Sequence, residues 1–172
     1  MMKVLIVVDM LKDFMEKQGA LYCGDESRKI IPFIKEKIKE RRASGGKVIY
    51  ICDTHDAGDK EFSMYDPHAV KGSEGAQIID ELKPGQFDIV LEKKTLRPFY
   101  QTDLDGILRE LDPEEVGVVG VCTSICVMEA VGGLRVRGYK TVVYSSGVAD
   151  FDMTSHESAL KRMEKTFKAR IE

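Results

Sequence analysis

The sequence predicts an α/β fold of three layers, in which a mostly parallel, doubly wound sheet of about six strands lies between helices. Two observations lead to this prediction. Short apolar runs rich in β-branched residues alternate along the chain with longer amphipathic stretches. The apolar runs are also almost continuously hydrophobic, which is typical of strands buried on both faces of a parallel sheet. Successive strands would then be joined by right-handed crossovers.

Five apolar runs are predicted as strands, and a short sixth strand is expected at the end of the chain. In order they are Val4–Val8, Val48–Cys52, Asp88–Glu92, Val116–Val121, Thr141–Ser145 and Ala169–Ile171. The amphipathic stretches predicted as helices are Ser27–Arg42, Gly75–Glu81, Leu104–Leu111, Ser124–Arg137 and Ser155–Lys168. No repeat, low-complexity tract or linker interrupts them, so residues 1–172 are predicted to form one domain.

Composition narrows the classes of partner. The net charge is −3 and the pI is about 5.7, whereas nucleic acid and anionic membranes call for a basic face. No apolar run approaches the roughly 20 residues that span a bilayer. The first ten residues contain one Lys and are interrupted by Asp9, which is typical of a first strand and not of a signal peptide. We therefore expect a cytoplasmic protein without nucleic-acid or membrane partners, and with reduced cysteines.

Reactive side chains follow four of the predicted strands. They are Asp9, Asp53 with His55, Lys93 or Lys94, and the segment from Cys122 to Cys126. Ligands of open parallel sheets bind at the carboxyl ends of the strands. The four groups are therefore expected to meet in one functional site.

Cys126 is the candidate nucleophile. If a helix begins near Thr123 or Ser124, Cys126 lies in its first turn, where unpaired N–H groups and the helix dipole favour the thiolate. The same N–H groups can bind an oxyanion. The alternative is that Cys126, like the other three cysteines, is a small buried hydrophobe.

Asp9 and a lysine are the candidates for the base and the cation. Asp9 ends a buried strand, so its carboxylate needs partners there. It is either a structural ion pair or helix cap, or a general base for the thiol. Lys93 or Lys94 would keep Asp9 ionised and lower the pKa of Cys126. The two lysines face opposite ways on a pleated strand, so only one of them can point into the site.

Two histidines lie close to Asp53. Asp53 and His55 are two residues apart, on the same side of an extended chain, and His68 follows thirteen residues later. Two imidazoles and a carboxylate suit zinc, iron or manganese and leave positions open for water or substrate. The third histidine, His156, lies in a helix-start segment and is expected at the surface or in a cap.

Taken together, these residues resemble the nicotinamidase branch of the isochorismatase-like cysteine hydrolase family, over almost the whole chain. The opening VLIVVDMLKDF is similar to the family's strand with its catalytic Asp and a Phe that borders the substrate. The resemblance implies Asp9 and Phe14 in these roles. The stretch EKKTLRPFYQTDL resembles the lysine segment, in which the Lys stands six residues before a Phe, and this implies Lys93 rather than Lys94.

The remaining motifs of the resemblance concern the metal and the nucleophile. The stretch DTHDAGDKEFSMYDPHAVKGSEG is similar to the metal region and implies Asp53, His55 and His68 as ligands of one divalent ion, with Tyr65 beside the substrate. The segment GVCTSICV resembles the nucleophile signature. It implies Cys126 as nucleophile, a cis peptide between Val121 and Cys122, and an oxyanion hole formed by the N–H groups of Cys122 and Cys126. The chain departs from the family pattern at Arg97-Pro98 and at Ser124.

The implied activity is hydrolysis of nicotinamide to nicotinate and ammonia through a cysteine thioester, with zinc as the expected metal and iron or manganese as alternatives. The implied partner is a small-molecule amide, and a homo-oligomer is compatible with the predicted exposed helices. Two rival hypotheses stay open. One is a metal-poor hydrolase of another small amide, a ureido compound or a vinyl ether. The other is a non-catalytic binding module that has kept the fold.

Overall fold

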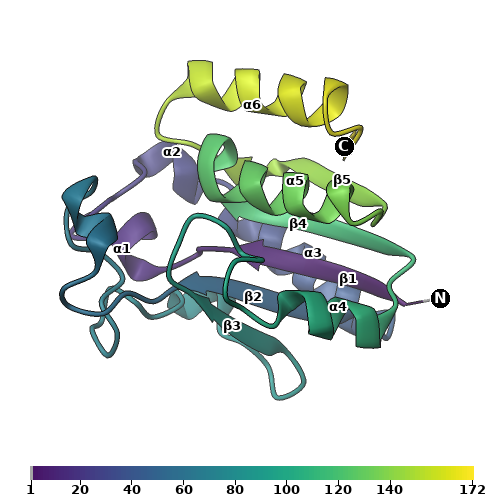
Figure 1. The fold of residues 1–172 in the computed structure, drawn as a ribbon, viewed down its shortest axis with the longest axis horizontal. Coiled ribbons are helices and arrows are strands. Elements are labelled where there is room, and N and C mark those ends of the chain that lie inside the picture. Colours follow the sequence, from purple (N-terminus) through teal and green to yellow (C-terminus); the bar gives the residue numbers. More distant parts are fainter. Residues whose placement is uncertain (1) are drawn as a thin grey trace.

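The computed structural model describes residues 2–172 and contains one six-stranded sheet between two layers of helices (Figure 1). The strands are β1 (Lys3–Val8), β2 (Lys47–Asp53), β3 (Ile89–Lys93), β4 (Glu115–Val121), β5 (Thr141–Ala149) and β6 (Arg170–Ile171). Their order in the sheet is β3-β2-β1-β4-β5-β6, and every neighbouring pair is parallel. The predicted fold class is confirmed.

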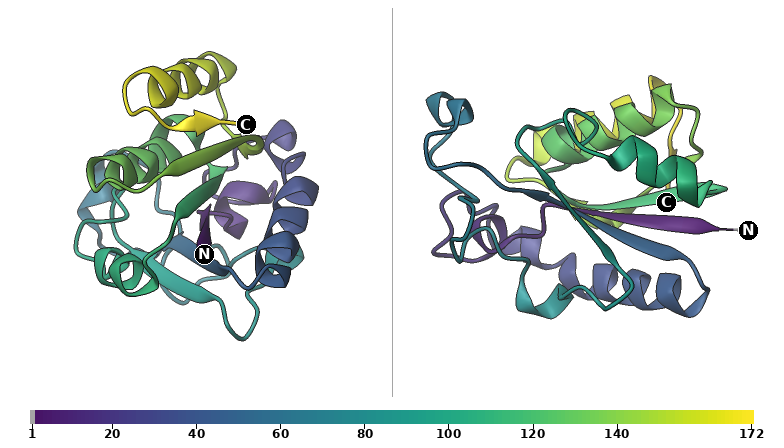
Figure 2. Two further views of the ribbon diagram at one scale, coloured as in Figure 1. Left: turned by 90° about the vertical axis from the view of Figure 1, so that its right-hand side faces the viewer. Right: turned by 60° about the horizontal axis from the view of Figure 1, so that its bottom comes forward.

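Helices cover both faces of the sheet (Figure 2). They are α1 (Lys12–Met15), α2 (Asp25–Arg28), α3 (Ile31–Ala43), α4 (Leu104–Leu111), α5 (Met128–Val136) and α6 (Met153–Lys165). The right-hand view shows α3 on one face and α4 and α5 on the other. Along β1, Leu5 and Val7 pack with α3 in one core, while the alternate residues Val4, Ile6 and Val8 pack with α4 and α5 in a second core. Burial of β1, β2 and β4 on both faces explains the continuous hydrophobicity of these strands.

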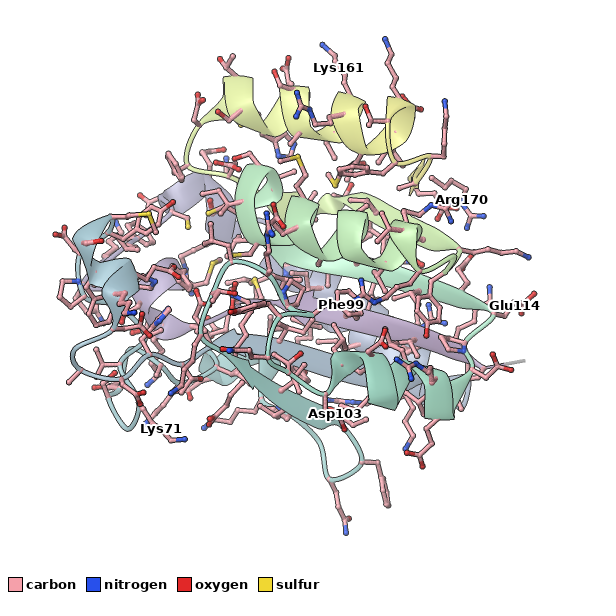
Figure 3. All side chains as sticks on the ribbon, in the orientation of Figure 1. Lys71, Phe99, Asp103, Glu114, Lys161 and Arg170 are labelled. Atoms are coloured by element: carbon pink, nitrogen blue, oxygen red, sulfur yellow. The ribbon has the colours of Figure 1, made fainter. Side chains whose placement is uncertain are left out.

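The charged side chains labelled in Figure 3 lie at the outside of these layers. Lys161 projects from the outer face of α6 and Arg170 from the end of the chain, and both are exposed. None of the helices within residues 2–172 is both long enough and apolar enough to cross a membrane.

The predicted helix over Gly75–Glu81 is wrong. Only a short 3-10 turn, Asp80–Leu82, forms at its end. The preceding residues instead run beside the chain that leaves β1, where Ile78 makes an antiparallel bridge with Leu11, and the N–H of Ile79 donates to the carbonyl of Met10 at 3.0 Å. Backbone bonds to a distant segment thus replace the local helical bonds.

Three other predicted elements differ from the structure by more than a shift of up to three residues at their ends. The helix predicted over Ser27–Arg42 is divided into α2 and α3, and Pro32 lies in the first turn of α3, where a missing N–H does no harm. The helix predicted over Ser124–Arg137 opens with a π-helical turn, Thr123–Val127, and continues as α5. Strand β5 extends to Ala149, four residues beyond its predicted end.

Adjacent strands β1 and β4 form the point at which the strand order reverses. From β1 the chain builds toward β3, and from β4 toward β6. The two strands approach closely at their ends, because Gly120 pairs with Val8, and a Cβ on Gly120 would collide with the carbonyl oxygen of Val8. Such a reversal leaves a crevice beyond the carboxyl ends of the strands, where ligands of this architecture bind.

Candidate functional site

Four predicted site residues meet in this crevice. Asp9 follows β1, Asp53 and Lys93 end β2 and β3, and Cys126 lies in the π-helical turn after β4. All four side chains are buried, none more than 6% exposed. Asp9 has a φ of +49°, a backbone conformation that non-glycine residues rarely adopt. Such a conformation persists only where the surrounding structure holds it. Here the Asp9 N–H donates to the carbonyl of Ile51 at 2.8 Å, and Asp9 Oδ1 accepts from the N–H of Asp53 at 2.8 Å.

Lys93 lies at the centre of the cluster. Its Nζ is 2.9 Å from Asp9 Oδ2 and 3.7 Å from Cys126 Sγ, and it also pairs with the carboxylate of Asp53. The neighbouring Lys94 points the other way, is half exposed and pairs with Asp56. The side of the strand that each lysine occupies is therefore the one that the resemblance implies.

Burial and the neighbouring charges set the protonation of the cluster. Burial, reinforced by Asp53, raises the pKa of Asp9 to about 6, against the opposing effect of Lys93. Burial acts to lower the pKa of Lys93, but Asp9, Cys126 and Asp53 outweigh it and hold that pKa well above its ordinary value. Lys93 is therefore a fixed positive charge beside the carboxylate and the thiol.

The expectation of a lowered Cys126 pKa is wrong. Burial raises the pKa of the thiol well above its ordinary value and outweighs the effect of Lys93. Asp9 adds to the rise because its negative charge disfavours a second anion. Cys126 is thus a neutral thiol next to a carboxylate, and a base is needed to remove its proton.

The turn that carries Cys126 presents backbone donors. The peptide bond between Val121 and Cys122 is cis, at the position that the resemblance indicates. The carbonyl of Cys122 accepts from the N–H groups of Ile125, at 3.1 Å, and Val127, at 3.2 Å. In an α-helix this carbonyl would accept from the N–H of Cys126. In the π-helical turn the carbonyl of Cys122 instead accepts from the N–H one residue later, that of Val127, so it does not bind the N–H of Cys126.

Asp53, His55 and His68 form a second cluster, which shares Asp53 with the first. Their donor atoms lie within 4.8 Å of one another, and all three residues are buried. His55 Nε2 is 3.9 Å and His68 Nε2 is 3.8 Å from the Asp53 carboxylate. The Nδ1 atoms face other groups, since His55 Nδ1 is 3.2 Å from Asp59 and His68 Nδ1 is 2.8 Å from the Asp66 carbonyl.

This arrangement fits a divalent metal. His55 Nε2 is buried and has no hydrogen-bond partner among the described residues. A metal-bound histidine usually donates its other ring N–H to a carboxylate or carbonyl, which is the environment of both Nδ1 atoms here. Two imidazoles and one carboxylate match the preferences of zinc, and also those of iron and manganese. The three residues could hold one such ion.

A cavity of about 410 Å³ opens beside both clusters. The residues predicted to border the substrate or to form the oxyanion hole line this cavity, namely Phe14, Tyr65, Val121 and Cys122. Asp9, Asp53, His68 and Cys126 line it as well. The rings of Phe14 and Tyr65 lie against His68, with centroids 5.6 and 6.2 Å apart. The departures from the family pattern at Arg97, Pro98 and Ser124 are not among the lining residues.

Sequence reasoning missed several residues of the site. Glu61 lines the cavity, its Oε1 is buried without a hydrogen-bond partner among the described residues, and burial raises its pKa. Cys23 also lines the cavity, with its sulfur 3.3 Å from that of Cys122. Asp150 accepts from the N–H of Ser124 at 2.7 Å, and His156 Nδ1 is 2.9 Å from the Thr123 hydroxyl. Of these residues, only Glu61 has a signal in the local sequence, because it lies between the predicted metal ligands His55 and His68.

Comparisons with known proteins agree with this geometry. The model of the isochorismatase domain matches residues 3–171. The chain is 33% identical over 181 residues to the isochorismatase family protein PncA of Bacillus subtilis (strain 168), covering 99% of each chain. The crystal structure of nicotinamidase/pyrazinamidase PncA from Bacillus subtilis superposes with a TM-score of 0.94 at 31% identity, covering 99% of each chain. The pyrazinamidase of Pyrococcus horikoshii in complex with zinc superposes with a TM-score of 0.91 at 27% identity, covering 99% of this chain and 98% of that one.

Proposed function

Because the chain belongs to the isochorismatase family, we propose that it is a cysteine-dependent amidohydrolase that converts nicotinamide to nicotinate and ammonia. The observation that carries the proposal is the cluster of Asp9, Lys93 and Cys126, in which Asp9 and Cys126 line the cavity and Lys93 contacts both. A base and a thiol that each lie within 4 Å of the same cation are the parts that nucleophilic catalysis on an amide requires.

The reaction begins with transfer of the Cys126 proton to Asp9. The pKa of Asp9, about 6, leaves it mostly ionised at neutral pH and able to accept that proton. As Asp9 becomes neutral, the positive charge of Lys93 is left to stabilise the thiolate. The sulfur attacks the carboxamide carbon, and the carbonyl oxygen becomes an oxyanion.

The N–H groups of Cys122 and Cys126 receive this oxyanion. Backbone donors aimed at a developing charge stabilise it without reorganisation. As the carbon–nitrogen bond breaks, Asp9 gives its proton to the leaving group, which departs as ammonia. Asp9 then takes a proton from water, the hydroxide attacks the thioester, and the proton returns to the sulfur as nicotinate leaves.

Asp53, His55 and His68 would hold the metal, which we propose to be zinc. When bound, it would supply a Lewis acid that coordinates the pyridine nitrogen of the substrate. Phe14 and Tyr65, which lie against His68, would flank the ring of the substrate. The relative that is a pyrazinamidase in complex with zinc supports this choice of metal.

The charge of the cavity favours a neutral substrate. Among the described residues, no Lys or Arg lines the cavity, and Lys93, which lies next to it, is already paired with the carboxylates of Asp9 and Asp53. A substrate carboxylate that entered the cavity would lose its hydration without gaining an ion pair with a free Lys or Arg, which is costly. Nicotinamide carries no net charge, whereas ureido acids and the vinyl ether of a dicarboxylic acid do.

The test is a screen for ammonia release from the purified protein. Nicotinamide and pyrazinamide represent neutral aromatic amides, and an N-carbamoyl amino acid and a ureido acid represent anionic substrates. We expect turnover of nicotinamide and at least about 100-fold lower kcat/KM for the anionic compounds, equivalent to the 2.7 kcal/mol of two tenfold steps. Preference for an anionic compound would favour another hydrolase of the family. No turnover of any compound would favour a binding module.

A further inference from the structure

Asp150 is a buried carboxylate that the catalytic cluster does not use. It follows β5 directly and is 5% exposed. No ion pair involves it within residues 2–172. Its partners are backbone N–H groups: Oδ2 accepts from Ser124 at 2.7 Å, and Oδ1 accepts from Asp152 at 3.3 Å. A buried carboxylate without a cation is costly unless N–H groups satisfy it, so these bonds are what keep Asp150 in place.

The sheet brings Asp150 to the turn of the nucleophile. Val121 and Ala149 are paired in the β4–β5 ladder, so the residues that follow them, Cys122 and Asp150, leave the sheet side by side. Ser124 lies two residues before Cys126, at the start of the π-helical turn. A carboxylate at a helix start is stabilised by the unpaired N–H groups and by the dipole.

We propose that Asp150 is a positioning residue for Cys126. Its carboxylate accepts from the N–H of Ser124 and so holds the turn that carries the nucleophile in place. The inference rests on the proposed function, because positioning matters only if Cys126 reacts. The contact between the Thr123 hydroxyl and His156 Nδ1, at 2.9 Å, fixes the same turn from α6.

Rigid placement is needed because the thiol has two partners. Cys126 Sγ is 3.7 Å from Lys93 Nζ, within the same buried cluster as Asp9. A misplacement of about 1 Å can cost a reaction about 100-fold in rate without a change in substrate contacts. Asp150 is not among the residues that line the cavity, so its loss should change kcat and leave KM nearly unchanged.

The test compares Asp150→Ala and Asp150→Asn with wild type, and uses Asp152→Ala as the matched control. Asp152 is a nearby carboxylate that also accepts N–H bonds, but from Thr154 and Ser155 at the start of α6. Kinetics are measured on the amide that the wild type hydrolyses fastest, and hydrogen exchange is followed in the segment 122–127.

We expect Asp150→Ala to lower kcat by about 100-fold, with KM changed less than about threefold and faster exchange in this segment. Asp150→Asn keeps an oxygen that can accept from Ser124, but a neutral bond is about half as strong as a charged one, so kcat should fall by only about 3- to 10-fold. Asp152→Ala should keep kcat within about threefold, although it loses a helix cap and some stability.

Three results would overturn the inference: a folded Asp150→Ala with kcat close to that of wild type, an Asn variant as impaired as the Ala variant, or an equal loss in Asp152→Ala. If circular dichroism shows that Asp150→Ala does not fold, the Asn variant decides, and a kcat equal to that of wild type overturns the inference. A wild-type protein that hydrolyses no amide defeats the proposed function instead. The exchange rates then still report whether Asp150 holds the turn.

Discussion

The ammonium group of Lys93 lies 2.9 Å from the carboxylate of Asp9, and each side chain is at most 2% exposed. Removal of one partner from a buried ion pair leaves the other charge uncompensated, which costs about 3–5 kcal/mol. Lys93 also pairs with Asp53, so its loss would leave two carboxylates together. The pair therefore links the stability of the fold to the chemistry of the site.

Replacement of this lysine should impair both activity and stability. Lys93→Met keeps most of the side-chain volume and removes the charge. We expect ammonia release to fall by at least about 1000-fold, since the charge that favours the Cys126 thiolate is lost. Chemical denaturation should show a loss of about 3 kcal/mol or more in the free energy of unfolding.

Lys94→Met is the matched control for Lys93→Met. The Lys94 side chain is 56% exposed and pairs with Asp56, and surface ion pairs contribute about 0–1 kcal/mol. Activity should stay within about twofold of wild type, as for substitutions away from the site. A loss of activity in Lys94→Met with an active Lys93→Met would contradict the assignment of the cation.

If Asp53, His55 and His68 hold the metal, replacement of His55 or His68 should lower the metal content, whereas replacement of His156 should not. His55→Ala and His68→Ala should each lower the zinc content of the purified protein from about one ion per chain to well below half, because three protein ligands are the minimum for most such sites. The metal content is measured by plasma mass spectrometry. Zinc added to chelator-treated wild type should also raise its Tm, since an ion that binds only the folded state stabilises it.

His156→Ala is the control for metal content. His156 bonds the Thr123 hydroxyl and is not part of the group formed by Asp53, His55 and His68. Its replacement should leave the zinc content unchanged. Full zinc content in both His55→Ala and His68→Ala would show that the metal is held elsewhere.

Gly120→Ala should destabilise the protein strongly. Gly120 has a φ of +121°, and an added Cβ would collide with the backbone of Val8, immediately before Asp9. Backbone strain of about 1–3 kcal/mol adds to this collision. We expect a loss of at least about 3 kcal/mol in a denaturant titration. Gly58→Ala, where a Cβ meets nothing within 4 Å, should change stability by less than about 0.5 kcal/mol.

The sequence predicts the sheet well because burial on both faces leaves a local signature. The apolar runs of β1, β2 and β4 could be recognised without knowledge of their neighbours. The segment Gly75–Glu81 has an equally clear helical pattern, but its backbone bonds go to the chain after β1, sixty or more residues away. A contact between distant segments leaves no periodic signal in either of them.

The residues of the site show the same difference between local sequence signals and contacts that depend on distant segments. Asp9, Asp53 and Cys126 could be identified because each follows a predicted strand. The pleat of the strand left Lys93 and Lys94 as alternatives, and only the resemblance distinguished them. The raised pKa of Cys126 could not be predicted, because the helix start is visible in the sequence, whereas the depth of burial is not. Asp150 and His156 act on the turn of the nucleophile from 26 and 33 residues away, so no local pattern marks them.

The central claim is that Cys126 is the nucleophile, and a comparison of two cysteine variants tests it most directly. Ammonia release from nicotinamide is measured for wild type, Cys126→Ala and Cys52→Ala. Cys52 is the control because it is also buried, but its side chain extends from β2 into the core that contains α3 and does not line the cavity. We expect Cys126→Ala to remain folded and to lose at least about 1000-fold in kcat, while Cys52→Ala stays within about threefold of wild type. Turnover by folded Cys126→Ala at a rate near that of wild type would contradict the claim.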